Sequence, residues 1–363
     1  MKLFQPAILI LFGLFIHGIT GTPYPTYFPT YIEEEVTAPQ QLINILHIGD
    51  SYSSGNGFDV DESGWYGPKW CFRNHDSWGE QAIRLINAVI PPTVDISYHN
   101  HACCDAKIEH ITQDKVTVAK CGHNDGDGDP QYTRKYAGWN FLDGRTCEHR
   151  MAPQIDNVDE SIDIVLLTIG GNDSGFVEII KSCFIPFLSV FGQDDCEEVI
   201  ERARGYVHGY YESELINVLT MITSRMRGGS KLILHAYPLI ATDRETEDNI
   251  LVREITQAAI EVQMKAIEYL NSLGREVDII LFKDHVYEFE GHNAETCSSC
   301  YNPNGWLNEI SETGISLEKD ERAQLYHPNE QGHKNWAISF ADTLGSIVYE
   351  MIEASETSNS TLI

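Results

Sequence analysis

Short runs of apolar and β-branched residues alternate along this chain with segments whose apolar residues recur every three or four positions. Runs of the first kind, typical of buried strands, lie at residues 42–48, 94–99, 162–169, 231–236 and 277–282. Segments of the second kind, typical of amphipathic helices, lie at residues 77–90, 252–273 and 336–351. Strands that alternate with such helices form a parallel sheet covered on both faces. We therefore predict an α/β fold, a three-layer α/β/α sandwich around a central, mainly parallel sheet.

One domain accounts for this pattern, because no repeat and no linker divides it. We place the domain at residues 41–352 and expect a polar C-terminal tail at 353–363. Departures from the alternating pattern are interpreted as loop insertions, at residues 57–72, 104–150 and 285–311. With 363 residues the chain is long enough to bury a large apolar core.

The N-terminus has the pattern of a secretory signal peptide, which we assign to residues 1–21. Lys2 precedes an apolar run from Ala7 to Ile19, and small residues follow near its end. This run is short for the roughly 20 residues that cross a bilayer as a helix, although an uncleaved anchor is the alternative. Residues 22–40 are rich in Pro, Tyr and Thr, and we expect an extended N-terminal arm there.

Cysteine content and charge are consistent with an extracellular protein. The nine cysteines fit an oxidising compartment, and their odd number leaves at least one thiol unpaired or paired between molecules. Asn359 begins a glycosylation sequon in the polar tail. With 25 basic and 54 acidic residues, the net charge of −29 opposes binding to nucleic acids or anionic membranes. We expect a secreted protein that has no nucleic-acid partner and acts as a monomer.

Three short polar sequence blocks lie next to the expected strands and helices, at positions where active-site residues are common in α/β proteins. They are Gly-Asp-Ser at 49–51, Gly-Gly-Asn-Asp at 170–173 and His-Pro-Asn at 327–329. Active sites of open parallel sheets lie at the carboxyl ends of the strands. A serine in a strand-to-helix turn exposes its hydroxyl, an asparagine amide donates to an oxyanion, and a histidine takes the serine proton. Taken singly, each block is equally compatible with an ordinary turn or helix cap.

Taken together, the blocks resemble the SGNH (GDSL-like) hydrolases, in particular the secreted esterases and lipases related to streptomycete enzymes. The resemblance extends over about residues 42–351. It includes the segment from Phe289 through Cys297 to Asn308, which looks like the one preceding the histidine block in that branch. The family resemblance implies an SGNH/flavodoxin-like fold and an ester substrate, with no cofactor.

The resemblance also implies a role for each matching residue. Ser51 would be the nucleophile and His327 the general base, while the amide of Ser51 and the side chain of Asn172 would hold the oxyanion. Asn172 also begins a sequon, which we expect to be unglycosylated because the residue faces the pocket. We therefore expect a carboxylic ester hydrolase. Alternatives are a carbohydrate deacetylase on the same fold and a non-catalytic binding protein.

Two positions depart from the family pattern. Gln324 stands three residues before His327, where the family has Asp, so we expect its backbone carbonyl or side-chain oxygen to orient the imidazole. Glu321 or Glu330 would be the alternative if a carboxylate is needed. Asp105 occupies the place of a glycine whose amide joins the oxyanion hole, and its carboxylate would oppose the oxyanion unless it points away.

Disulfides take up most of the cysteines in our interpretation. The resemblance implies the pairs Cys71–Cys103 and Cys183–Cys196, and proximity in sequence suggests Cys121–Cys147 and Cys297–Cys300. Cys104 is then left free.

Metal binding is the less favoured reading of two other clusters. His99, His101, Cys103 and Cys104 are ligands by residue type, but disulfides are favoured in a secreted chain. The acidic segment 125–129 imitates a calcium loop, yet Pro130 stands where such a loop needs glycine. We therefore expect no metal.

Overall fold

The computed structural model describes residues 41–58, 64–121, 129–140, 144–184, 195–243, 246–294, 302, 304–309 and 325–360. Several expectations fall outside these ranges, namely the signal peptide at 1–21, the arm at 22–40, Glu321, Gln324, the Cys297–Cys300 pair and the acidic segment at 125–128. In the part of the chain that is described, no helix is long and apolar enough to cross a membrane.

The central sheet contains the five strands that the sequence predicts. They are β1 (Gln41–Gly49), β4 (Val94–Asn100), β8 (Ile164–Thr168), β9 (Lys231–His235) and β10 (Asp278–Phe282). All neighbours pair in parallel in the order β10-β9-β8-β1-β4. Every residue of β8 is buried, as expected for a strand covered on both faces. The predicted three-layer α/β/α fold is confirmed.

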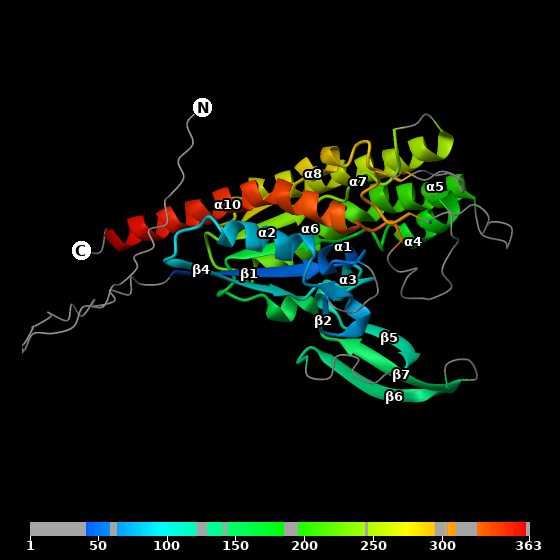
Figure 1. Cartoon of the computed structure of the whole chain (residues 1–363), viewed down its shortest axis with the longest axis horizontal. Helices are drawn as coiled ribbons and strands as arrows, with labels where there is room; N and C mark the ends of the chain where they lie inside the picture. Colours follow the sequence, from blue (N-terminus) through cyan, green and yellow to red (C-terminus); the bar gives the residue numbers. More distant parts are fainter. Residues whose placement is uncertain are drawn as a thin grey trace, which may run out of the picture. The chain divides into compact units, whose positions relative to one another are not determined.

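Helices cover both faces of this sheet (Figure 1). Helices α2 (Trp78–Asn87) and α10 (Glu330–Ser360) contribute to one apolar cluster, in which the indoles of Trp78 and Trp336 stack at 4.9 Å. The second cluster, on the other face, includes α5 (Cys196–Tyr206), α6 (Glu212–Thr223) and α7 (Glu247–Ser272). Because α10 continues to Ser360, residues 353–360 of the expected tail are helical.

Residues 104–150, expected as a loop insertion, contain a second sheet that the sequence analysis did not predict. Its antiparallel strands are β5 (Lys115–Lys120), β6 (Tyr132–Asn140) and β7 (Gly144–Met151), in the order β5-β7-β6. The disulfide Cys121–Cys147 joins the end of β5 to β7. Figure 1 shows this small sheet beyond the central one, away from the helical layers.

Short elements complete the described chain. They are α1 (Ser51–Ser54), β2 (Trp65–Tyr66), η1 (Lys69–Cys71), β3 (Arg73–Asn74), α3 (Glu109–Thr112), η2 (Gln154–Asn157), α4 (Phe176–Ile179), η3 (Ile180–Phe184), η5 (Val207–Tyr211) and α8 (Asp284–Glu288). Of these, α1, which follows β1, and α4, which follows β8, stand at the carboxyl edge of the sheet, where the polar blocks lie.

Candidate active site

Ser51 stands at the first residue of α1, in a tight turn after β1. The turn requires Gly49, whose φ is +127° and whose missing Cβ would lie 2.2 Å from the Thr168 carbonyl oxygen. Gln154 fixes the same glycine from both sides, because its side chain accepts from the Gly49 amide at 2.6 Å and donates to its carbonyl at 2.9 Å. The position of Ser51 is therefore set by the end of the central strand.

His327 approaches Ser51 from a loop before α10. Its Nε2 lies 2.7 Å from the Ser51 Oγ, a hydrogen bond between groups 276 residues apart in sequence. Asn308 holds the loop, since its amide donates to the His327 carbonyl at 2.9 Å and its carbonyl accepts from Tyr326 at 2.7 Å. The Tyr52 hydroxyl donates to the Tyr326 carbonyl at 2.8 Å, which ties the loop to the serine turn.

A backbone carbonyl accepts the hydrogen bond from the other side of the imidazole. The His327 Nδ1 lies 3.1 Å from the Leu325 oxygen. Since a carbonyl only accepts, Nδ1 carries the proton and Nε2 is left to accept from the serine hydroxyl. Gln324, which we expect to supply an oxygen here, lies outside the described residues, so this role stays a prediction; among the described residues the acceptor is the carbonyl of Leu325.

Asn172 and Asp105, the expected oxyanion donors, come from the loops after β8 and β4. Asn172 donates one amide hydrogen to the Ala106 carbonyl at 2.9 Å, which fixes the direction of the other. Asp105 has φ +59°, the left-handed conformation that glycine adopts most easily. The residue is exposed, and its side chain also hydrogen-bonds the thiol of Cys104.

Asp50, next to the serine, is a buried carboxyl that the sequence analysis left without a role. It accepts hydrogen bonds from the Tyr52 amide at 3.1 Å, from the Thr168 hydroxyl at 2.7 Å and from the Tyr237 hydroxyl. Burial raises its pKa to about 7, even though these donors favour the charged form. The side chain joins β1, β8 and the segment after β9.

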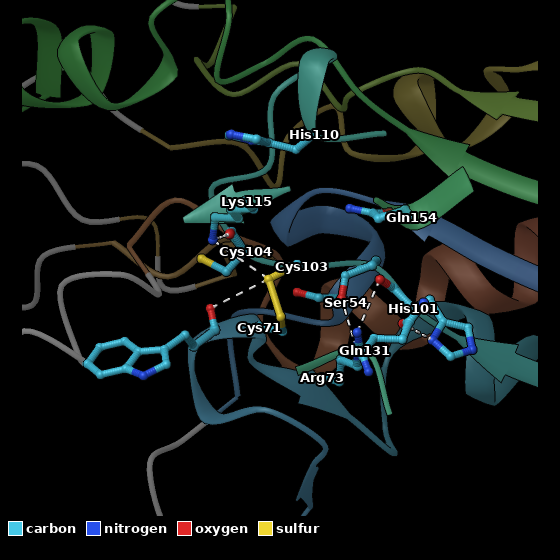
Figure 2. Close-up of a disulfide and its surroundings, with 12 residues drawn as sticks. Ser54, Cys71, Arg73, His101, Cys103, Cys104, His110, Lys115, Gln131 and Gln154 are labelled. Carbon is cyan, nitrogen blue, oxygen red and sulfur yellow. Dashed lines mark hydrogen bonds between the residues drawn. A yellow bond between two sulfur atoms is a disulfide. The ribbon is translucent and has the colours of Figure 1, made fainter. Parts of the chain in front are cut away.

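A disulfide lies beside the loop that carries Asp105. Cys71 and Cys103 are bonded, and Cys104 adjoins them (Figure 2). Cys104 is a free, buried cysteine whose sulfur accepts a hydrogen bond from Asn56 at 3.3 Å. Burial raises the pKa of this thiol. The amine of Lys115 donates to the Cys104 carbonyl and fixes the loop further.

The remaining pairing also matches expectation, because Cys183 is bonded to Cys196. Cys103 is not available as a metal ligand in the cysteine–histidine cluster, because its sulfur is bonded to Cys71. Within the described ranges, no three His, Cys, Asp or Glu side chains are grouped as metal ligands.

Three residues of this arrangement were missed by reasoning from sequence. Gln154, Leu325 and Tyr237 carry no motif and lie far along the chain from Ser51. Tyr237 follows β9, so the rule that chemistry collects after parallel strands is the one signal that points to it.

Comparison with known proteins agrees with this architecture. No protein-family model matches the chain. A curated lipase from Streptomyces rimosus is 26% identical over 182 residues, which is 50% of this chain and 60% of the lipase. The matched region thus spans less than two thirds of that relative.

Solved structures extend the similarity in fold. The extracellular lipase from Streptomyces rimosus has a TM-score of 0.53 at 19% identity, covering 83% of this chain and 99% of the lipase. Phospholipase A1 from Streptomyces albidoflavus NA297 has a TM-score of 0.52 at 18% identity, and the match covers 84% of this chain and 98% of the phospholipase. Fold and site therefore define the class, an α/β/α protein with a serine–histidine pair at the sheet edge. Together with the sequence match, they make the chain similar to streptomycete lipases in fold and in part of its sequence.

Proposed function

We propose that the protein is a secreted carboxylic ester hydrolase that works through an acyl-enzyme on Ser51. One observation carries the proposal: the imidazole of His327 is 2.7 Å from the serine hydroxyl and is oriented by the Leu325 carbonyl. A buried, oriented serine–histidine pair is what nucleophilic catalysis requires.

The reaction proceeds in two steps, acylation of Ser51 and hydrolysis of the acyl-enzyme. His327 takes the proton of Ser51 as its oxygen attacks the ester carbonyl, and then gives that proton to the leaving alcohol. Water then attacks the acyl-serine, losing a proton to His327, and the proton returns to the serine as the acid leaves. With the Leu325 carbonyl behind it, the imidazole is fixed in the tautomer that lets Nε2 take the serine proton.

The negative oxygen of each tetrahedral intermediate would be held by three donors. They are the backbone amides of Ser51 and Asp105 and the side-chain amide of Asn172. One such donor is worth about 3 kcal/mol of barrier. Asp105 is an exposed residue, which supports a role for its backbone amide rather than for its carboxylate.

Secretion is part of the proposal and rests on different observations. Three disulfides fit an oxidising compartment, and one similar protein is an extracellular lipase. Mass spectrometry of the protein from culture medium should give a mature N-terminus near residue 22. Recovery with residues 1–21 intact and membrane-bound would support an uncleaved anchor instead.

The decisive experiment compares p-nitrophenyl acetate and butyrate, with acetylated xylan as a separate arm for the deacetylase alternative. Ser51→Ala and His327→Ala should abolish turnover while the melting temperature stays close to wild type. Ser54→Ala is the matched control, because it removes a buried serine hydroxyl three residues away that bonds only the Ser51 carbonyl in the described structure. Wild-type protein that turns over none of these substrates, or Ser51→Ala protein that keeps full turnover, would refute the proposal.

A further inference from the structure

An apolar pocket of about 50 Å³ lies between helix α7 and the segment that follows β8. Its walls include Gly170, Gly171 and Phe176 on one side and Ile255, Ala259 and Gln263 on the other. A water molecule needs roughly 10–15 Å³ by this measure, so the pocket has room for about three or four heavy atoms in a row.

The pocket shares walls with the catalytic site. The ring of Phe176 packs edge-on against the His327 imidazole at 5.5 Å and also lines the pocket. Tyr237 is a second shared wall, because its hydroxyl bonds Asp50 and accepts from the Gly171 amide at 3.0 Å. Gly171 directly precedes Asn172, the expected oxyanion donor. An acyl group bound to the Ser51 Oγ would therefore lie near residues that also line this pocket.

Two features fix the size of the pocket. A Cβ on Gly170 would lie 2.4 Å from the ring of Tyr211, so this wall cannot carry a side chain without moving the tyrosine. The Tyr211 hydroxyl is itself held, since it donates to the Ile169 carbonyl at 3.0 Å and accepts from Gln263 at 2.9 Å. The far end of the pocket is thus closed by fixed groups.

Gln263 supplies an unused acceptor in this apolar setting. The residue is 1% exposed, and its side-chain nitrogen is committed to Tyr211. Its Oε1 has no hydrogen-bond partner among the described residues. A buried carbonyl left without a donor is unfavourable, so an occupant that brings a donor is preferred over one that does not.

We propose that this pocket holds a short acyl group of the ester, and that the Gln263 oxygen accepts a hydrogen bond from a hydroxyl on that group. The inference rests on the proposed ester hydrolysis and specifies its substrate class as short, hydroxylated acyl esters. A three-carbon chain beyond the carbonyl fills the space, whereas an octanoyl chain exceeds it. A purely aliphatic chain that reaches the end would cover the glutamine oxygen without pairing it.

The test measures kcat/KM for the p-nitrophenyl esters of acetate, butyrate, octanoate and each enantiomer of 3-hydroxybutyrate. We expect one 3-hydroxybutyrate enantiomer to exceed butyrate by on the order of tenfold, the factor associated with satisfying one buried acceptor. Octanoate should fall below butyrate.

Gln263→Leu keeps the volume and removes the acceptor, so the advantage of the hydroxyl should disappear. Gln257→Leu is the matched control, because it makes the same change at an exposed position of α7. If Gln263→Leu does not fold, Ala259→Leu gives an independent answer. It fills the pocket and should lower butyrate turnover much more than acetate turnover.

Equal loss of acetate and butyrate turnover in Ala259→Leu, or a hydroxyl preference that survives Gln263→Leu, would overturn the assignment of the pocket. In either case Ser51-dependent hydrolysis would still stand. Absence of any Ser51-dependent hydrolysis in the wild type would instead refute the proposed function, and the pocket assignment with it.

Discussion

Acidification should destabilise this protein through four histidines buried in its interior. His47, His235, His285 and His333 are each 0% exposed. Burial lowers the pKa of His47 and His285 to about 3 and that of His333 to about 4, and it lowers the pKa of His235 well below its usual value. In the unfolded chain the same imidazoles titrate near 6.5.

The direction in which stability changes with pH follows from how many protons each state binds. Below pH 6.5 the unfolded chain takes up protons that the folded chain refuses, so stability is lost as the pH falls toward the folded pKa values. Each histidine contributes a slope that rises from about 0.7 kcal/mol per pH unit at pH 6.5, where half of the unfolded imidazoles are protonated, toward about 1.4 kcal/mol per unit at lower pH. Between pH 6.5 and 5 the four together cost about 7 kcal/mol.

Two buried carboxyls act in the opposite direction. Burial raises the pKa of Asp50 to about 7 and that of Asp173 to about 6, so the folded chain holds these protons where the unfolded chain has released them. Together these two carboxyls add about 3 kcal/mol to the free energy of unfolding as the pH falls from 6.5 to 5. The net loss, about 4 kcal/mol, is a large fraction of the stability of many domains.

Equilibrium urea unfolding at pH 6.5 and 5.0 measures this loss directly. His285→Gln should reduce the slope of unfolding free energy against pH by up to about 1.4 kcal/mol per unit. His75→Gln is the control, because the His75 side chain is 61% exposed and should leave the slope unchanged. Stability that stays constant or rises on acidification, or equal slopes in the two variants, would refute the reasoning.

Three further outcomes are expected at the active site. Asn172→Ala should lower kcat for p-nitrophenyl butyrate by roughly 10²- to 10³-fold with little change in melting temperature, and a loss below fivefold would argue against an oxyanion role. Gln324→Ala should keep most of kcat, because the Leu325 carbonyl orients the imidazole; a hundredfold loss with intact folding would contradict this. Gly49→Ala should reduce the yield of folded protein, since its Cβ would collide with a neighbouring strand, and a wild-type melting temperature would show that the turn adapts.

The strands and helices of the main domain were predictable because each carries a local pattern. The run at 42–48 is almost continuously apolar, and α7 repeats apolar residues at helical spacing over several turns. The sheet of β5, β6 and β7 lacks such a pattern because its two outer strands, β5 and β6, have little buried face. Val118 on β5 is 62% exposed and Trp139 on β6 is 65% exposed. Without burial on one side, alternation of apolar and polar residues is weak.

In the candidate site, too, some residues were predictable from local sequence patterns and others were not. Ser51, Asn172 and His327 stand in recognisable blocks, so their roles were predicted from the family resemblance. Gln154 was not, because a single glutamine before a strand has no local signature and its contacts with Gly49 arise from the packing of η2 against β1. The order of the strands likewise depends on long-range pairing and cannot be deduced from the individual segments.

The separation between the two halves of the proposed dyad has a consequence for biosynthesis. Ser51 leaves the ribosome early, whereas His327 emerges 276 residues later, after all five strands of the central sheet. On the proposed mechanism, an unfinished chain would hold the nucleophile without its base and would not yet hydrolyse esters. The rate of ester hydrolysis during refolding would therefore report when these two distant parts of the chain have come together.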